Sequence, residues 1–283
     1  MKDVAGLVVT YNRKEKLLKN INSLLNQNYP LKKIYIIDNN STDNTYEYIK
    51  DTLTKNKQII YIKLDENTGG SGGFSFGLKK ISEESKCDYV WGMDDDAYPN
   101  KDALEKIMKR IKNNCCYYSN SDNDKDGYKN NLKLVDNWMF VGFFIPIRII
   151  KEIGPSKDNY FIYHDDSEYA YRIIKKGYKI YKVKDSIIYH DNGINNNNVL
   201  TKRIFGKEVF IPNIPNWKMY YFVRNNILMY RFSDIKRYKV VFFIIPKFLI
   251  RVLLINKKQF FISFKGYIHG IFNISGKKVS PWK

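Results

Sequence analysis

Three consecutive carboxylates, Asp94-Asp95-Asp96, follow a short apolar run at residues 89–93. Adjacent carboxylates repel one another unless a cation or a hydrogen-bond donor neutralises them. Mg²⁺ or Mn²⁺, which prefer oxygen ligands, would meet that need and would also bind a diphosphate. A solvated acidic turn is the alternative, but the position at the end of a buried strand favours a metal site.

A second acidic segment, His164-Asp165-Asp166-Ser167-Glu168, precedes an apolar pattern that predicts a helix to about Lys176. Carboxylates in a first helical turn complement the helix dipole, so a purely structural role is open. The alternative makes one of these carboxylates a general base. His190 ends a β-like run at residues 186–189 and is a candidate metal ligand, with a structural histidine as the alternative.

The third candidate is the glycine-rich stretch Asn67-Thr68-Gly69-Gly70-Ser71-Gly72-Gly73-Phe74. Glycines let backbone N–H groups approach a phosphate or sugar, and the N-terminus of a following helix favours an anion. The stretch lacks the Gly-Lys-Ser/Thr of a Walker loop, and it does not follow the first strand as a dinucleotide fingerprint would. A flexible turn is the alternative, but its place in the chain favours ligand contact.

These candidates must be positioned by alternating strands and helices. Apolar β-branched runs predict strands, and residues such as Leu17 and Ile21 repeat with helical spacing. Asn12 and Glu15 resemble a capping box at the start of the first helix. We expect strands at 4–10, 34–37, 59–64 and 89–93, and helices at 14–25, 44–53, a short one ending at 81, and 101–111. This order predicts βαβ units with a parallel sheet.

Polar or glycine residues follow each predicted strand, and ligands of such sheets bind at the carboxyl ends of the strands. The four ends are Thr10-Tyr11-Asn12, Asp38-Asn39-Asn40, residues 67–73 and residues 94–96. We therefore expect them to form one site. Residues 119–131 and 192–198 are expected to be polar loops.

The composition excludes several classes of protein. A hydrophobic fraction of 44% excludes global disorder, and three Cys exclude a disulfide scaffold and fit a reducing cytoplasm. We expect no secretory signal in the first residues. The formal charge is +19, of which residues 200–283 carry +15 and residues 1–199 only +4. A basic RNA-binding protein is one alternative, but the basic region holds no recognisable nucleic-acid motif.

Together the motifs resemble the family 2 inverting glycosyltransferases of the GT-A fold, across roughly residues 3–190. The matching segments are L-V-V-T-Y-N-R, I-I-D-N-N-S-T-D-N-T, W-G-M-D-D-D-A-Y-P and F-I-Y-H-D-D-S-E-Y. Galactofuranosyltransferases are the most similar subgroup, and rhamnosyltransferases share much of the pattern. Phe76 departs from it, because many relatives carry Arg there. The resemblance implies an α/β, Rossmann-like, mixed and mostly parallel sheet flanked by helices.

The resemblance also implies roles for individual residues. Asp166 matches the base, and Asp165 and Glu168 would orient it or bind acceptor hydroxyls. Trp138 and Tyr169 would contact the acceptor. The donor contacts would be Thr10, Asn12, Asp38 and Asn40 at the nucleoside, Asn67, Gly69, Gly70 and Gly73 at the diphosphate and sugar, and Asp94 and Asp95. Asp94, Asp96 and His190 would bind Mn²⁺ or Mg²⁺.

These roles predict a metal-dependent inverting glycosyltransferase in the synthesis of a cell-surface polysaccharide. The expected donor is UDP-galactofuranose, with dTDP-rhamnose as the alternative, and the expected acceptor is a hydroxyl of a lipid-linked saccharide. The intact carboxylates disfavour a catalytically inactive sugar-nucleotide-binding protein. No nucleic acid is expected as a partner.

We divide the chain into a catalytic domain, residues 1–200, and a basic, aromatic-rich helical segment, residues 201–283. Within that segment, residues 240–255 (VVFFIIPKFLIRVLLI) are apolar but carry Lys247 and Arg251. A spanning helix needs about 20 mostly apolar residues, so these charges argue against insertion. An interfacial helix on anionic lipid and a helix buried against the catalytic domain both stay open. The interfacial alternative predicts a cytoplasmic protein bound at the inner face of the membrane, and the segment could also mediate self-association.

Overall fold

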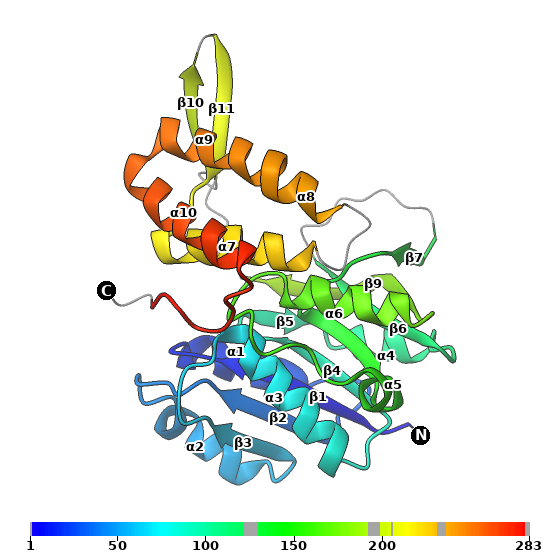
Figure 1. Cartoon of the computed structure of the whole chain (residues 1–283). Coiled ribbons are helices and arrows are strands. Elements are labelled where there is room, and N and C mark those ends of the chain that lie inside the picture. Colours follow the sequence, from blue (N-terminus) through cyan, green and yellow to red (C-terminus); the bar gives the residue numbers. More distant parts are fainter. Residues whose placement is uncertain (1, 122–129, 192–198, 205, 231–235, 281–283) are drawn as a thin grey trace. The chain divides into compact units, whose positions relative to one another are not determined.

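The computed structural model describes residues 2–121, 130–191, 199–204, 206–230 and 236–280 (Figure 1). The chain forms two compact units, an N-terminal unit of Met1–Asp158 with Tyr169–Asn192 and a C-terminal unit of Asn159–Glu168 with Gly193–Lys283. The predicted division at residue 200 differs from these units in two respects. The later part of the C-terminal unit begins at residue 193 and not at residue 201. The segment Asn159–Glu168, which carries the second acidic group, belongs with the C-terminal unit. Of the loop predicted at 119–131, residues 119–121 belong to a strand and residues 122–129 lie outside the described residues, as does the whole loop predicted at 192–198.

A nine-stranded mixed sheet forms the centre of the N-terminal unit, with the order β3-β2-β1-β4-β8-β6-β9-β5 and with β7 paired to β9. Its first four strands in the chain run parallel, and β8 pairs antiparallel with β4. The strands are β1 (Val4–Thr10), β2 (Lys33–Asp38), β3 (Ile59–Lys63), β4 (Tyr89–Asp94), β5 (Ala97–Pro99), β6 (Cys115–Ser121), β7 (Leu132–Val135), β8 (Val141–Pro146) and β9 (Lys179–His190). The predicted α/β architecture, a mixed sheet flanked by helices, is confirmed.

Helices cover both faces of this sheet because alternate residues of the central strands point to opposite sides. In β1, Val4 and Val8 pack with one group of helices, while Leu7 and Val9 pack with the other. The first group is α1 (Lys14–Leu25), α2 (Thr45–Lys55) and α4 (Ala103–Met108), and the second is α3 (Gly69–Glu84), α5 (Ile147–Ile153) and α6 (Asp165–Lys175). The central strands are buried on both faces, as their continuous apolar runs predict.

Two local predictions were wrong. The residue before α1 is Arg13, and Asn12 makes no capping box, because Asn12 has a φ of 53° and accepts a hydrogen bond from the Thr42 N–H at 2.7 Å. The glycine-rich stretch is not a loop before a short helix. It is the first part of α3, which begins at Gly69 and runs for 16 residues.

Close packing explains why a helix this rich in glycine forms against the sheet. A Cβ placed on Gly73 would lie 2.5 Å from Val9 Cγ1, and a Cβ placed on Gly77 would lie 2.4 Å from Leu7 Cδ1. Glycines at these two positions, one helical turn apart, let α3 approach β1 more closely than any other residue would allow. A Cβ on Gly70 would meet nothing within 4 Å, so packing does not require glycine there.

The C-terminal unit consists of an antiparallel hairpin and a set of helices. These elements are β10 (Val199–Ile204), β11 (Lys207–Pro212), α7 (Asn216–Met229), α8 (Arg237–Lys239), the π-helical turn η1 (Val240–Ile244), α9 (Ile245–Ile255) and α10 (Lys257–Ile271). Buried residues of α7, η1 and α9 form its core. Pro246 has no N–H for an ordinary helical hydrogen bond, and the π-helical turn ends two residues before it. Within the described part of the chain, no helix is long and apolar enough to cross a membrane.

We predict that Gly77→Ala destabilises the protein by about 1–3 kcal/mol, because the added methyl group overpacks the contact with Leu7 and Ile37. The matched change on the same helix, Gly70→Ala, should be neutral or stabilise by up to about 1 kcal/mol, since it meets no atom and reduces the entropy of the unfolded chain. Urea unfolding followed by circular dichroism measures both free energies. Equal free energies of unfolding for the two variants would contradict the packing explanation.

Candidate functional site

The carboxyl ends of β1, β2, β3 and β4 meet at one edge of the sheet. Thr10 lies opposite Asp38 in the pairing of β1 with β2, and Val9 lies opposite Asp94 in the pairing of β1 with β4. Lys63 at the end of β3 lies opposite Asp38. The predicted convergence of four polar strand ends is therefore confirmed, and it sets the place of the candidate site.

Asn39, which was predicted at this edge without a role of its own, joins two of these ends. Its Nδ2 donates to the Gly69 carbonyl at 2.8 Å, and its Oδ1 accepts from the Thr68 hydroxyl at 2.8 Å. The side chain is only 2% exposed, so it anchors the start of α3 to the end of β2. Its position directly after the second strand, between two predicted contacts, was the available sequence signal.

Hydrogen bonds also fix the loops after β1 and β2. Asp38 is 1% exposed and accepts from the Ser41 N–H at 2.7 Å and from the Tyr61 hydroxyl. Burial raises the pKa of Tyr61, and the hydrogen bond to Asp38 raises it further. The N–H of Asn12 donates to the Ser41 hydroxyl at 2.9 Å. These contacts shape the edge where nucleoside binding is predicted, and the direct contacts of Thr10, Asn12, Asp38 and Asn40 with a nucleoside stay predictions.

The glycines predicted at the diphosphate have different structural reasons. Gly69 has a φ of 74°, in the left-handed region, and its N–H donates to Asn67 Oδ1 at 2.8 Å. Gly73 is required by its contact with Val9, as described above. Only Gly70 has open space beside it and no packing reason to be glycine. Among these three glycines, Gly70 is the one whose identity the fold does not explain, and close approach of a ligand to the backbone would explain it.

Cationic and donor side chains neutralise Asp95 and Asp96. Arg13 Nη1 lies 3.2 Å from Asp95 Oδ1 and 2.8 Å from Asp96 Oδ2, and the Thr10 hydroxyl donates to Asp95 Oδ2 at 2.7 Å. His190 Nε2 lies 3.2 Å from Asp96 Oδ1. Repulsion among the carboxylates alone therefore does not require a metal. Arg13 ends the segment L-V-V-T-Y-N-R, but no pattern in the sequence indicates that it pairs with Asp95 and Asp96.

The two carboxylates are shifted in opposite directions. Burial raises the pKa of Asp95, although Arg13 and Thr10 oppose the rise. Burial also acts to raise the pKa of Asp96, but the hydrogen bond with His190 and the charges of Arg13 and Lys16 outweigh it, so the pKa falls below its ordinary value. Asp96 is therefore held as a carboxylate, the form that binds a cation.

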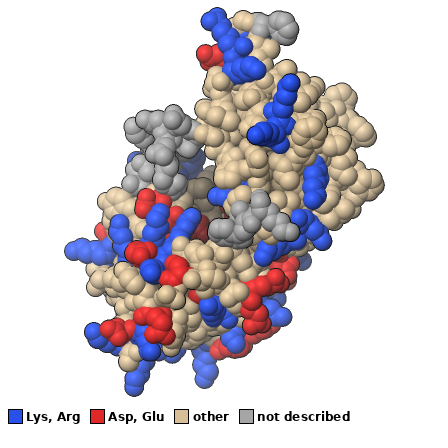
Figure 2. All heavy atoms as spheres, turned by 90° about the vertical axis from the view of Figure 1, so that its left-hand side faces the viewer, with Lys and Arg blue, Asp and Glu red and all other residues tan. Residues whose placement is uncertain are grey.

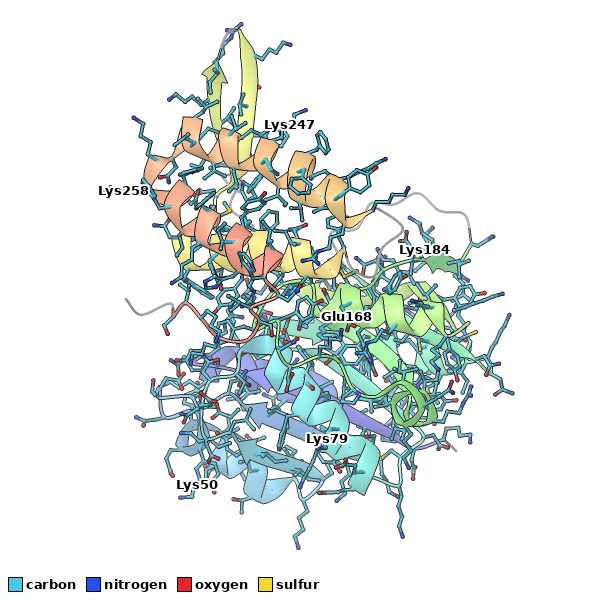
Figure 3. The ribbon with its side chains drawn as sticks, viewed as in Figure 1. Lys50, Lys79, Glu168, Lys184, Lys247 and Lys258 are labelled. Carbon is cyan, nitrogen blue, oxygen red and sulfur yellow. The ribbon has the colours of Figure 1, made fainter. Side chains whose placement is uncertain are left out.

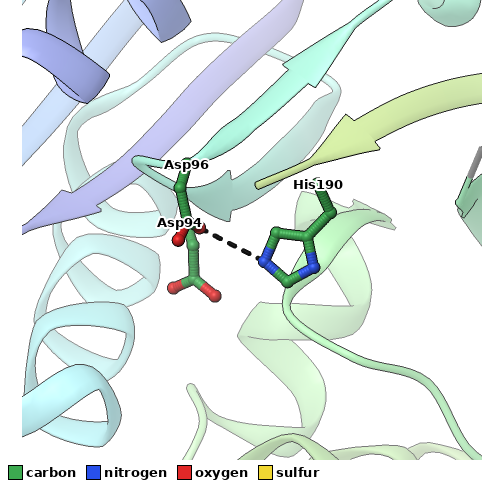
Figure 4. A group of neighbouring side chains, drawn as sticks. All are labelled: Asp94, Asp96 and His190. Atoms are coloured by element: carbon green, nitrogen blue, oxygen red, sulfur yellow. Dashed lines mark ion pairs between the residues drawn. The ribbon is translucent and has the colours of Figure 1, made fainter. Parts of the chain in front are cut away.

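Asp94, Asp96 and His190 form the candidate metal centre (Figure 4). One ligand atom from each lies within 4.8 Å of the others. His190 reaches the group because the end of β9 pairs with β5, with His190 opposite Ala97. Two carboxylates and one imidazole make a donor set that suits a divalent ion such as Mn²⁺. The three residues predicted as ligands are thus brought together, and their binding of an ion stays a prediction.

The second acidic group, up to Glu168, forms the first turn of α6. This turn belongs to the C-terminal unit, whereas the rest of α6 belongs to the N-terminal unit. Asp165 is 8% exposed and Glu168 is fully buried, and the Glu168 N–H donates to the His164 carbonyl at 2.9 Å. Burial raises the pKa of Asp165 to about 8, and the charge of Asp166 adds to the rise. Burial raises the pKa of Asp166 to about 6, against the hydrogen bonds that Ser167 donates to it. The pair therefore holds one proton near neutral pH and keeps one carboxylate able to accept another.

The two aromatic residues predicted to contact an acceptor are placed in the core. Trp138 is 2% exposed and packs against Phe143 and Tyr169, and Tyr169 is fully buried with its hydroxyl donating to the Gly154 carbonyl. Neither ring offers an exposed face for a sugar. We therefore assign both residues to packing and do not retain them as acceptor contacts.

Residues 7–163, more than half of the chain, match the sequence profile of the family described as Glycosyl transferase family 2. The poly-β-1,6-N-acetyl-D-glucosamine synthase of Staphylococcus epidermidis is 32% identical over 111 residues, which are 39% of this chain and 26% of that protein. The synthase of Staphylococcus aureus is 30% identical over 112 residues, 40% of this chain and again 26% of the relative. The match thus spans about a quarter of the length of these curated relatives.

Solved structures share the fold at low sequence identity. A mannosyltransferase from Pyrobaculum calidifontis, PcManGT, in complex with GDP-Man and Mn²⁺, has a TM-score of 0.61 at 11% identity, covering 96% of this chain and 87% of that chain. GalNAc-T7 with UDP, GalNAc and Mn²⁺ has a TM-score of 0.59 at 15% identity, covering 66% of this chain and 43% of that chain. S. aureus TarS has a TM-score of 0.52 at 16% identity, covering 89% of this chain and 44% of that chain.

We predict that Asp96→Asn weakens Mn²⁺ binding by more than about 100-fold, because it removes a charged ligand atom. Loss of a residue that only supports a ligand typically weakens metal binding about 10–100-fold. Isothermal titration with Mn²⁺ measures the change. Asp191→Asn is the matched control, because Asp191 follows His190 in the chain but is not one of the three predicted ligands. Its side chain is 54% exposed and forms an ion pair with Lys16. Equal Mn²⁺ affinity for Asp96→Asn and the unchanged protein would refute the metal centre.

Proposed function

The chain belongs to glycosyl transferase family 2, and we propose that it transfers a sugar from a nucleotide-sugar donor to a hydroxyl group of a saccharide with inversion at the anomeric carbon. The observation that carries this proposal is the presence of two carboxylate groups in opposite electrostatic states. Asp96 is kept ionised beside cations, and the pair Asp165 and Asp166 is kept partly protonated by burial. Acidic groups with pKa values shifted in opposite directions are typical of sites in which one group binds a cation and the other transfers a proton.

On the donor side, Asp94, Asp96 and His190 would hold Mn²⁺ or Mg²⁺. When bound, the ion would supply positive charge against the diphosphate leaving group. Asp95 lies outside this group of three, and its two oxygens accept hydrogen bonds from Thr10 and Arg13. It holds Arg13 in place, and the guanidinium, with a side chain 49% exposed, remains available to an anionic donor.

On the acceptor side, Asp166 would be the general base. Its carboxylate takes the proton of the attacking hydroxyl while the hydroxyl oxygen bonds to the anomeric carbon. The bond from that carbon to the diphosphate breaks, and the nucleoside diphosphate leaves from the opposite face, which inverts the configuration. Asp165, whose pKa burial raises, would bind an acceptor hydroxyl or orient Asp166, and Glu168 would do the same.

UDP-galactofuranose is the proposed donor, with dTDP-rhamnose as the alternative. Support comes from the segments N-T-G-G-S-G-G-F and D-D-S-E-Y and the later His190, which resemble galactofuranosyltransferases. The curated relatives are named as synthases of poly-β-1,6-N-acetyl-D-glucosamine, which makes UDP-N-acetylglucosamine a third donor to test and a polysaccharide a fitting product.

The proposed acceptor is a lipid-linked saccharide, and the C-terminal unit would bind the inner face of an anionic membrane. Residues 240–255 have one face buried in the core of the C-terminal unit itself and one exposed face, and the exposed face supports the interfacial alternative. Ile245, Leu249 and Val252 of α9 are buried in the core of the unit, whereas Ile250 and Leu253 are exposed. A helix that is apolar on both faces needs a second apolar neighbour.

The exposed apolar side chains continue onto the neighbouring elements. Phe242 and Phe243 of η1 are 68% and 66% exposed, and Phe261 of α10 is 72% exposed. Lys247 of α9 and Lys258 of α10, labelled in Figure 3, lie in the same stretch of chain. The upper part of the view in Figure 2, which holds the hairpin of β10 and β11, likewise shows separate basic side chains on a mostly neutral surface. Exposed apolar groups with basic groups around them are the features of an interfacial helix on anionic lipid.

We predict that the purified chain with Mn²⁺ releases UDP from UDP-galactofuranose in a donor panel that also holds dTDP-rhamnose, UDP-N-acetylglucosamine and GDP-mannose. Asp166→Asn should lower kcat by about 10²–10⁴-fold, the typical contribution of a general base, with nucleotide binding unchanged. Because the base must be ionised and burial raises the pKa of Asp166 to about 6, kcat of the unchanged enzyme should fall as the pH drops through that value.

Asp158→Asn, which changes an exposed carboxylate eight residues earlier, is the control and should keep full activity. Release of another nucleotide in the panel would replace the donor assignment alone. Near-normal turnover by Asp166→Asn would remove Asp166 as the base.

We predict that the protein sediments with vesicles of phosphatidylglycerol, is released by about 0.5 M salt because salt screens the basic side chains, and does not bind phosphatidylcholine vesicles. Phe242→Ser combined with Phe243→Ser should lower the partition coefficient at least about tenfold, since each Phe contributes apolar area to the contact. Tyr46→Ser, at a 45% exposed ring on α2, is the control. Absence of vesicle binding at low salt, together with a dimer that the Phe variant dissociates, would assign this face to self-association instead.

A further inference from the structure

The loop before the second acidic group has an unfavourable backbone conformation. Phe161, Tyr163 and His164 have φ values of 67°, 69° and 66°. Residues with a Cβ adopt this left-handed region rarely, so the surroundings must hold them there. The loop leads directly into Asp165 and Asp166, which makes its conformation part of how those carboxylates are directed.

Asn225 of α7 holds the carbonyl groups of this loop. Its Nδ2 lies 3.0 Å from the Tyr160 carbonyl, 2.6 Å from that of Ile162 and 3.0 Å from that of Tyr163. The side chain is fully buried. One amide NH₂ group therefore contacts three backbone carbonyl groups of the loop, and the same amide also carries an acceptor oxygen.

Arg224 supports the same arrangement. Its Nε donates to Asn225 Oδ1 at 2.8 Å, which fixes the orientation of the amide, and its Nη2 donates to the Tyr160 carbonyl at 2.8 Å. The guanidinium is fully buried, and it lies over the rings of Tyr220 and Tyr221 with centroid distances of 5.4 and 4.7 Å. Arg224 Nη1 also donates to the Gly276 carbonyl at 2.5 Å, in the segment that follows α10.

We propose that Arg224 and Asn225 are positioning residues, which hold the loop 159–164 so that Asp165 and Asp166 point in the direction needed for proton transfer. The connection is short, because the His164 carbonyl at the end of the loop accepts the hydrogen bond of the Glu168 N–H in the first turn of α6. This inference rests on the proposed role of Asp166. Neither residue needs to contact the substrate.

The test is Asn225→Ala in the full chain, with Asn226→Ala as the matched control. The amide of Asn226 donates only within α7, to the Phe222 carbonyl at 2.7 Å, among the contacts of the described residues. Asn225→Ala should lower kcat about 10²-fold, the effect of a displacement of about 1 Å at reacting groups, while the KM of the donor and the Kd of UDP with Mn²⁺ change less than about threefold. Asn226→Ala should change none of these values.

Asp166→Asn is assayed beside the two variants. Normal turnover in Asp166→Asn would overturn the assigned base, whereas an inactive Asp166→Asn with a fully active, folded Asn225→Ala would overturn the positioning role alone. Loss of UDP binding together with kcat would also overturn it, since a general loss of structure would then explain the effect. If Asn225→Ala does not give a cooperative thermal transition, Arg224→Lys decides: it keeps the charge but loses the planar donor fork, and it must show the same loss of kcat with unchanged donor KM.

Discussion

Repulsion among consecutive carboxylates is the constraint on which the donor edge of the N-terminal unit depends. The cost of leaving a buried charge unpaired is several kcal/mol, a large part of the about 5–15 kcal/mol that a whole domain gains on folding. The partners of Asp95 and Asp96 come from separate elements: Thr10 from the end of β1, Arg13 from the turn before α1, and His190 from the end of β9. The pairing of β9 with β5 is what brings His190 to this acidic group.

The glycines of α3 also help to shape the donor edge of the sheet, because they let α3 pack closely on the face opposite to α1. Because Gly73 and Gly77 have no side chains, α3 lies close enough to β1 for Asn39 to reach both Thr68 and Gly69. The start of a helix is thereby fixed against the strand ends by packing and hydrogen bonds together. A glycine-rich segment that looks suited to flexibility is in this protein a rigid part of the frame.

The outcome for the individual residues shows how far sequence reasoning reaches. The strands and the meeting of their ends were predictable, because apolar β-branched runs fix burial and parallel pairing fixes which ends meet. The group of Asp94, Asp96 and His190 was proposed from a family resemblance. The partners of Arg13 and Asn39 were not predictable, since pairing across the fold has no period in the sequence. The glycines at residues 69–73 suggested a loop, but the close contact of Gly73 with Val9 favours a helix there. Trp138 was predicted to contact the acceptor, whereas its ring is buried in the core.

The same type of side chain acquires two different chemical characters in this chain, and its neighbours decide which. Asp96 is buried, yet its pKa falls, because an imidazole and a guanidinium bond to it directly. Asp166 is also shielded from water, and the hydrogen bonds that Ser167 donates to it do not outweigh that burial, so its pKa rises. A carboxylate of the first kind attracts a cation and would be a poor base at neutral pH, while one of the second kind accepts a proton readily. Residue type alone therefore does not assign a function to an aspartate, but its charged neighbours do.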